Sequence, residues 1–226
     1  MSLSPDEIQA RIDRAREIQA AFSPEKVVAA VTRLFELDPV PGLEDEFTFP
    51  AFDKPTRQRI FGGQVIAQAL AAAARTVDPG KPAHSLHAYF LRGGDEAKPL
   101  HFRVHRDFDG RSFANRRVVV RQDGKVIFNL TASFHAPEAG ASHQVPMPDL
   151  LPPEDCIEFT ENMAADPNVS DAQLDRMARL RPFEIRSFRP PSTEKATAHY
   201  QWYRLAAPIG DDPLIHRAFL AYASDM

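Results

Sequence analysis

Residues 59–75 have the sequence RIFGGQVIAQALAAAAR, in which a pair of glycines precedes a segment that is apolar on almost every helical face. Such a segment predicts a helix buried on most of its sides, and its alanines would let another element approach closely. The glycine pair has two interpretations: a tight turn into the helix, or amides that hold an anion at the helix N-terminus. Gly62, Gly63 and Gln64 are therefore candidate ligand-binding residues, with capping or packing as the alternative for Gln64.

Strands are predicted after this helix, because apolar and polar residues alternate there with a period of two. The alternation is clearest where Phe128, Leu130 and Ala132 share one side. Aspartate–glycine pairs at 109–110 and 123–124 predict tight turns. The predicted strands cover residues 85–91, 100–108, 112–121 and 125–135, and we expect them to form a four-stranded antiparallel meander. A buried helix wrapped by a curved antiparallel sheet is the hot-dog arrangement, so we predict an α+β hot-dog fold.

The pattern then begins to repeat. Strands are predicted at 183–189 and 197–206, followed by a helix at 213–225 with Asp212 as its N-cap. Asp225 falls on the same helical face as the apolar Leu214 and Ala218. About 15 residues follow this helix start, so we expect a double hot-dog whose second repeat is incomplete. The predicted domains are 1–136 (two N-terminal helices, 5–21 and 24–34, a short strand at 47–52, and the first hot-dog), 137–182 (a linker) and 183–226 (the start of the second hot-dog).

Composition excludes several classes of protein. The chain has 226 residues, which is about one and a half domains at roughly 150 residues each. A net charge of −4 disfavours a nucleic-acid-binding protein, and no apolar run is long enough to predict a membrane span. Cys156 is the single cysteine, and the first residues are polar and acidic rather than a secretory signal. We therefore expect a cytoplasmic protein with Cys156 as an inert thiol.

Five stretches together resemble the acyl-CoA thioesterase II family, the double hot-dog thioesterases. They are FGGQV at 61–65, HSLHAYFLR at 84–92, DGRSF at 109–113, TASFHAPEAG at 131–140 and AYASD at 221–225. The resemblance covers residues 24–226. It implies hydrolysis of fatty acyl-CoA to a fatty acid and CoA, by a water that an Asp, a Thr and a Gln orient. Only the Asp has a counterpart here, Asp225, while Gly62, Gly63 and Gln64 are candidates for substrate binding.

The alternative hypothesis is a non-catalytic hot-dog remnant that binds acyl-CoA or only oligomerises. Thioester hydrolysis needs a group that takes a proton from water, and a carboxylate on an apolar helix face can do so. A solvated aspartate is the other interpretation of Asp225. We expect an acyl-CoA substrate, a homo-oligomer, no nucleic acid, no membrane span and no cofactor.

Other chemistry has weaker support in the sequence. His101 and His105 share a strand face but lie about 13 Å apart in an extended chain, which is too far for one metal. No Gly-x-Ser-x-Gly stretch is present, so a serine hydrolase is disfavoured. Four arginines at 111, 116, 117 and 121 lie around one predicted hairpin. They predict either contacts with CoA phosphates or a solvated edge of the sheet.

Overall fold

The computed structural model describes residues 3–55, 59–179, 181–188 and 200–226. Contacts divide the chain into two compact units, each described by itself. The sheet unit comprises residues 32–141 and 209–226, and the hairpin unit comprises residues 1–31 and 142–208. The domains predicted from the sequence were drawn from its repeated pattern, whereas these units are defined by contacts. The predicted domains therefore stay a prediction.

The sheet unit contains one antiparallel sheet of six strands. The strands are β1 (Asp38–Pro39), β2 (Glu46–Phe49), β3 (Ala83–Phe90), β4 (Leu100–Asp109), β5 (Phe113–Gln122) and β6 (Lys125–His135), in the order β1-β2-β4-β5-β6-β3. The predicted meander is therefore wrong for β3, which pairs with β6 so that Leu86 lies opposite Ala132. Short turns keep β4, β5 and β6 adjacent. The longer connection at 91–99 takes the chain across the sheet, and the amides of Leu91 and Arg92 donate to the Ile127 carbonyl on the way.

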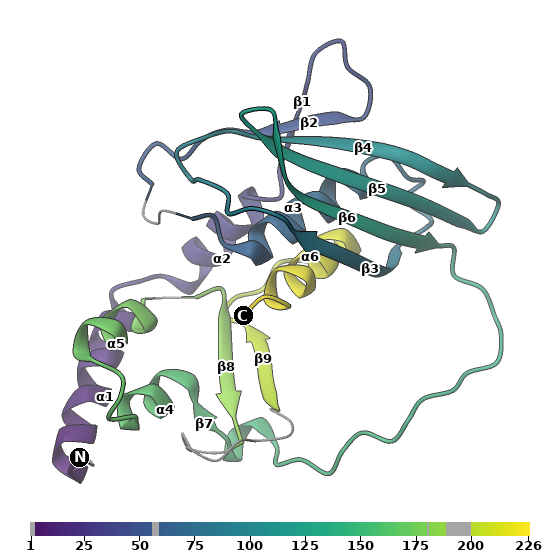
Figure 1. The fold of residues 1–226 in the computed structure, drawn as a ribbon. Helices are drawn as coiled ribbons and strands as arrows, with labels where there is room; N and C mark the ends of the chain where they lie inside the picture. The colour runs from purple at the N-terminus through teal and green to yellow at the C-terminus, as the bar shows by residue number, and fades with distance from the viewer. Residues whose placement is uncertain (1–2, 56–58, 180, 189–199) are drawn as a thin grey trace. The chain divides into compact units, whose positions relative to one another are not determined.

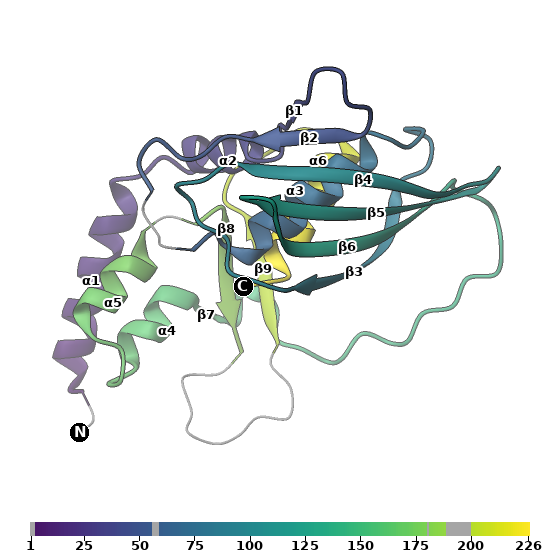
Figure 2. The ribbon, with the colours of Figure 1, turned by 45° about the horizontal axis from the view of Figure 1, so that its top comes forward.

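Helix α3 (Gly62–Ala74) lies against one face of this sheet, as Figures 1 and 2 show. It contacts β3, β4, β5 and β6, and α6 (Pro213–Ala223) packs beside it. Every residue of α3 from Gly63 to Ala73 is buried. The predicted sheet packed on a buried helix is thus confirmed, and the alternation within β4, β5 and β6 places their apolar side chains in this core.

The turn between β5 and β6 also follows the prediction. Asp123 and Gly124 have φ values of 47° and 73°. Positive φ at both central residues is the geometry that a two-residue hairpin needs, and glycine adopts it without a steric penalty.

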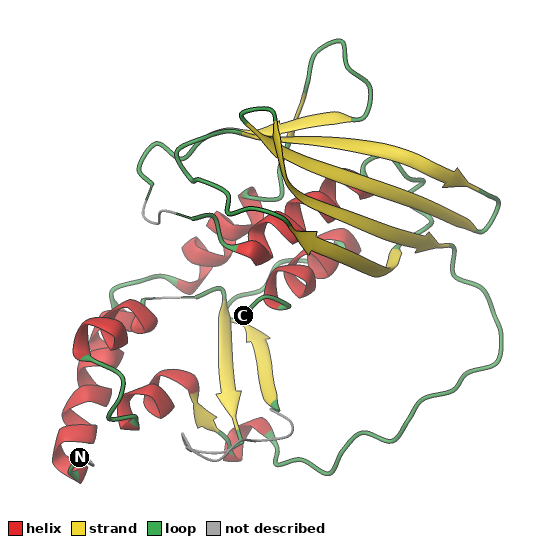
Figure 3. Ribbon diagram, viewed as in Figure 1, coloured by secondary structure: helices red, strands yellow, loops and turns green. Residues whose placement is uncertain are grey.

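The hairpin unit combines helices with a three-stranded antiparallel sheet, coloured red and yellow in Figure 3. Its elements are α1 (Pro5–Ala20), the start of α2 (Pro24–Arg33), the short 3₁₀ turn η1 (Pro153–Asp155), β7 (Ile157–Glu158), α4 (Phe159–Ala165), α5 (Asp171–Ala178), β8 (Phe183–Ser187) and β9 (Gln201–Leu205). Helices α1, α4 and α5 share a core of Ala15, Ala164, Leu174 and Ala178. The predicted end of the first strand at 189 and start of the second at 197 lie outside the described residues.

Candidate functional site

Asp225 lies just beyond the end of α6. The helix begins where the Asp212 carboxylate accepts a hydrogen bond from the Leu214 amide (2.8 Å), and it ends at Ala223 with Ser224 as its C-cap. The prediction that Asp225 belongs to an apolar helix face is therefore wrong, because the helix stops two residues earlier and Asp225 is exposed. Its position is set instead by the contact of α6 with α3.

A hydrogen bond joins Asp225 to the N-terminus of α3. The Gly63 amide donates to Asp225 Oδ2 at 3.1 Å. Because the first turn of a helix carries partial positive charge, this is a favourable place for a carboxylate. Oδ1 of Asp225 makes no hydrogen bond to the described residues, so it is available to accept one from water. The glycine pair thus receives an anion, and that anion is the chain's own carboxylate.

The two glycines also make room for the end of α6. A Cβ added to Gly62 would lie closer than 3.0 Å to Asp225 Oδ2 and to the Phe90 ring. A Cβ added to Gly63 would overlap the Tyr222 carbonyl oxygen, which belongs to the backbone of α6. The Phe61 and Tyr222 rings meet beside this contact with centroids 4.9 Å apart. The glycine pair therefore serves the close approach of two helices as well as the turn into α3.

A cavity of about 400 Å³ opens beside Asp225 within the sheet unit. Its walls combine apolar side chains, three glycines, two arginines and one carboxylate. They comprise Arg59, Ile60, Gly62, Val65, Phe90, Leu91, Arg92, Gly93, Gly94, Ile127, Phe128 and Asp225. Apolar walls with a few polar groups are typical of small-molecule sites. Asp225 and Gly62 are the candidates from the sequence that line this cavity.

Gln64 does not line the cavity. Its side chain is 4% exposed, and its Nε2 lies 3.5 Å from Gln68 Oε1. Gln68 in turn donates to the Leu34 carbonyl at 2.8 Å. These contacts are those of packed polar side chains within the sheet unit, so a binding role for Gln64 stays a prediction from the sequence.

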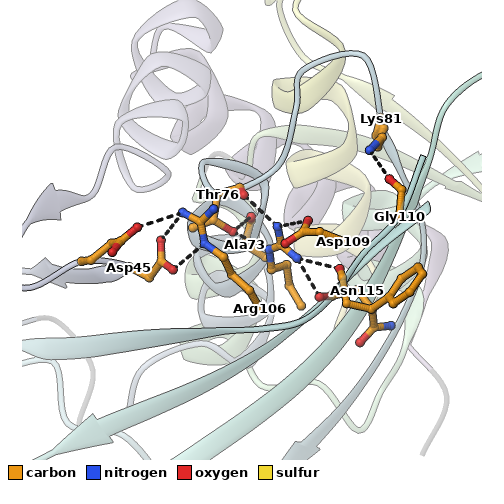
Figure 4. Close-up of polar contacts among 11 residues, drawn as sticks. Asp45, Ala73, Thr76, Lys81, Arg106, Asp109, Gly110 and Asn115 are labelled. Carbon is orange, nitrogen blue, oxygen red and sulfur yellow. Dashed lines mark hydrogen bonds and ion pairs between the residues drawn. The ribbon is translucent and has the colours of Figure 1, made fainter. Parts of the chain in front are cut away.

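The arginines of the β4–β5 hairpin differ in burial and in their hydrogen-bond partners. Arg116 is 1% exposed, which contradicts both of its interpretations from the sequence. Its side chain donates hydrogen bonds to Thr76, Asp109 and Asn115, which are all labelled in Figure 4. The Arg116 guanidinium donates to Thr76 Oγ1 at 2.8 Å, to the Thr76 carbonyl at 2.9 Å and to Asp109 Oδ1 at 2.6 Å. Arg117 is exposed and pairs with Asp107. Arg116 therefore ties the end of α3 to the sheet.

Two histidines of the sheet contact neighbouring side chains. His84 Nε2 lies 2.9 Å from Ser133 Oγ, and the His135 ring stacks on Phe113 with centroids 4.0 Å apart. Burial, followed by the positive charges of Arg117 and Arg103, lowers the pKa of His105 below its usual value. Within the described part of the chain, no three His, Cys, Asp or Glu side chains are grouped so that they could hold a metal ion.

Cys156 is buried, and its Sγ lies 3.4 Å from the Pro152 carbonyl oxygen.

Most of the cavity residues were not candidates from the sequence, among them Arg59, Phe90 and Arg92. Arg59 precedes the FGGQV stretch, and the other two belong to the HSLHAYFLR stretch. Their positions beside these stretches are the only signal in the sequence. Which of them face the cavity depends on β3 lying next to β6.

Known proteins resemble this chain over most of its length. The family model described as acyl-CoA thioesterase N-terminal domain matches residues 52–135. Acyl-coenzyme A thioesterase 8 of Rattus norvegicus is 36% identical over 208 residues, covering 86% of this chain and 64% of that protein. Acyl-CoA thioesterase 2 of Haemophilus influenzae is 35% identical over 176 residues, covering 74% and 60%. The chain thus spans about 64% of the first of these relatives.

Several solved structures are also similar to this chain. The acyl-CoA thioesterase II from Mycobacterium marinum has a TM-score of 0.67 and 34% identity, covering 87% of this chain and 67% of that one. A tesB protein from Mycobacterium avium subs. paratuberculosis has a TM-score of 0.67 and 32% identity, covering 87% and 69%. A protein with a hot-dog fold from Alicyclobacillus acidocaldarius has a TM-score of 0.63 at 22% identity, with 87% and 68% covered. The predicted hot-dog fold is confirmed. Among the described residues, every helix is too short or too polar to cross a membrane.

Proposed function

Because the chain belongs to the acyl-CoA thioesterase II family, we propose that it hydrolyses fatty acyl-CoA to a fatty acid and CoA, with Asp225 orienting the attacking water. The observation that carries the proposal is the position of Asp225: its carboxylate borders a cavity with both apolar and charged walls and is held by the first turn of α3.

The Asp225 carboxylate has the geometry of a group that orients water. Oδ2 is fixed by the Gly63 amide, so the carboxylate cannot rotate freely. Oδ1 can accept a hydrogen bond from a water and take its proton as the water attacks the thioester carbonyl. The nearby N-terminus of α3 carries partial positive charge, which favours the negative charge that develops on the carbonyl oxygen.

The rest of the cavity suits the two halves of an acyl-CoA. Ile60, Val65 and Phe128 offer an apolar surface to a fatty acyl chain. Arg59 and Arg92 border the same cavity, and guanidinium groups bind phosphate well. We assign the acyl chain to these apolar side chains and the CoA phosphates to the two arginines, with Gly62 beside the thioester and the Gly63 amide holding Asp225.

Replacing Asp225 by asparagine tests the proposal. Asparagine can still accept the hydrogen bond from Gly63, but it cannot take a proton from water. We expect hydrolysis of a fatty acyl-CoA to fall by roughly 10²–10⁴-fold, the usual contribution of a general base. The measurement is the release of free thiol from purified protein, with circular dichroism to verify folding.

Asp211→Asn is the matched control, because Asp211 is an exposed aspartate of the same unit that does not line the cavity. It should leave the rate unchanged. A folded protein without turnover would favour the alternative, a hot-dog that binds acyl-CoA or only oligomerises. The observation behind that alternative is that the family's Thr and Gln have no counterpart in these 226 residues. Turnover that survives Asp225→Asn would remove Asp225 from the mechanism.

The free edge of the sheet supports a further part of the proposal, the association of two copies through β3. This strand ends the strand order, so among the described residues one side of its backbone has no neighbouring strand. Tyr89 is 59% exposed and Phe90 is 53% exposed. An edge strand of eight residues with exposed aromatic side chains is prone to pair with another strand. We also propose that the protein works in the cytoplasm, which its single, buried cysteine supports.

A further inference from the structure

A second cavity, of about 320 Å³, lies within the hairpin unit. Its lining residues come from α1, α2, β7, α4, α5, β8 and β9, together with Arg179, Arg181 and Ala206 beside these elements. The charged residues among them are Glu158, Arg179, Arg181, Glu184, Arg186 and Arg204. The volume is at the lower end of the roughly 300–1,000 Å³ that small-ligand sites occupy.

Both carboxylates of this cavity are already engaged. Glu158 caps α4: its Oε2 accepts from the Thr160 amide at 2.7 Å and from the Glu161 amide at 3.1 Å. Glu184 Oε2 accepts from Arg204 Nε at 3.0 Å. Burial raises the pKa of Glu158, against the opposing effect of these amide hydrogen bonds. The four guanidinium groups thus outnumber the carboxylates by two.

Three further arginines line the cavity: Arg179 and Arg181 lie between α5 and β8, and Arg186 lies on β8. Arg181 lies over the Phe159 ring, 4.4 Å from its centroid, which presents a cation beside an aromatic surface. Among the described residues, Arg186 Nη1 makes long contacts, 3.4 Å each, with the carbonyls of Pro153 and Cys156. Arg179 makes no hydrogen bond or ion pair with the described residues.

We propose that this cavity is a binding site for a phosphorylated small molecule, whose phosphate is held by Arg179, Arg181 and Arg186. A phosphate ester carries close to two negative charges at neutral pH, and several arginines lining one cavity can bind it. The planar fork of a guanidinium binds two phosphate oxygens at once. Phe159 and Phe183 supply apolar walls for the organic part of the ligand. None of its lining residues lines the cavity that Asp225 borders, and binding here does not depend on hydrolysis.

ADP is the probe, titrated by calorimetry into the purified protein, with adenosine as the control that lacks phosphate. We expect ADP to bind and adenosine not to bind. Arg179→Gln and Arg186→Gln should each weaken ADP binding by roughly ten- to a hundredfold, the usual range for one charge-assisted contact. Arg179→Gln is the safer variant, because no described contact of the fold is lost with it.

Arg176→Gln is the matched control. Arg176 is an exposed arginine on α5 that does not line the cavity, so its replacement removes the same charge from the same unit. It should leave ADP affinity unchanged. The proposal is overturned if ADP does not bind, if adenosine binds equally well, or if Arg176→Gln weakens ADP as much as Arg179→Gln does.

The phosphate has two possible sources, the CoA of a substrate or a separate effector, and kinetics distinguishes them. If Arg179→Gln raises KM for acyl-CoA and ADP competes with the substrate, the site receives the phosphate of CoA. If KM is unchanged and ADP still binds, the site serves another phosphorylated ligand. A chain without hydrolytic activity would still answer the ADP titration, so failure of the proposed function and failure of this site remain distinguishable.

Discussion

Gly63 has two structural roles. Its amide donates a hydrogen bond to Asp225, and its missing side chain leaves space for the Tyr222 carbonyl oxygen. Replacing Gly63 by alanine should therefore force α3 and α6 apart. We expect the free energy of unfolding to fall by about 1–3 kcal/mol, the usual cost of overpacking a core. Urea denaturation followed by circular dichroism measures the change.

Gly140→Ala is the control, because a Cβ at Gly140 meets nothing within 4 Å. It should leave stability within about 0.5 kcal/mol of the original protein, as most surface substitutions do. Equal stability of the Gly63 and Gly140 variants would contradict the contact between α3 and α6.

Single residues of the site could be predicted from the sequence only in part. The family resemblance points to Asp225, the sequence before the buried helix points to the glycine pair, and these residues meet at one place. The reason they meet could not be predicted. It depends on how closely the end of α6 approaches α3. A distance between two helices produces no repeating pattern in the sequence from which it could be predicted. Gln64 shows the converse, a polar residue whose burial in the core is set by packing.

Arg116 connects elements, because it binds Thr76 just beyond α3 and lies on β5. Replacing Arg116 by methionine keeps much of the volume but leaves buried acceptors without donors. We expect a loss of roughly 1–3 kcal/mol in the free energy of unfolding. Arg117→Met, the neighbouring control, removes only an exposed pair with Asp107 and should cost less than about 1 kcal/mol. Similar losses in thermal or urea unfolding would show that the network does not tie α3 to the sheet.

The elements themselves were largely predictable, because alternation and aspartate–glycine turns are local signals. The place of β3 was not, since a strand's own sequence does not state which strand it pairs with. The burial of Arg116 was available in the pattern: it shares its side of β5 with Ala114 and Val118, which are both buried. A charged side chain is usually exposed, but the hydrogen bonds of Arg116 with Asp109 and Thr76 compensate for its burial.

Association through β3 is a property of the whole molecule. Replacing Leu86 by lysine puts a charge on the exposed edge strand, a substitution that discourages pairing between edges. We expect the original protein to sediment as a dimer and the Leu86→Lys variant to sediment as a monomer at the same concentration. Sedimentation velocity measures both.

Val145→Lys is the matched control, because Val145 is an exposed apolar residue outside the sheet. It should leave the dimer intact. A monomer at all concentrations of the original protein, or equal effects of the two lysines, would contradict pairing through β3.

The bond between Gly63 and Asp225 joins residues that are 162 positions apart in the chain. Closing so long a loop is entropically costly and is slow compared with forming the hairpins of β4, β5 and β6. The sheet can therefore form while the site is still open, and the site is complete only when α6 has docked on α3. Recovery of activity during refolding consequently reports the docking of α6, whereas the far-ultraviolet signal reports the sheet.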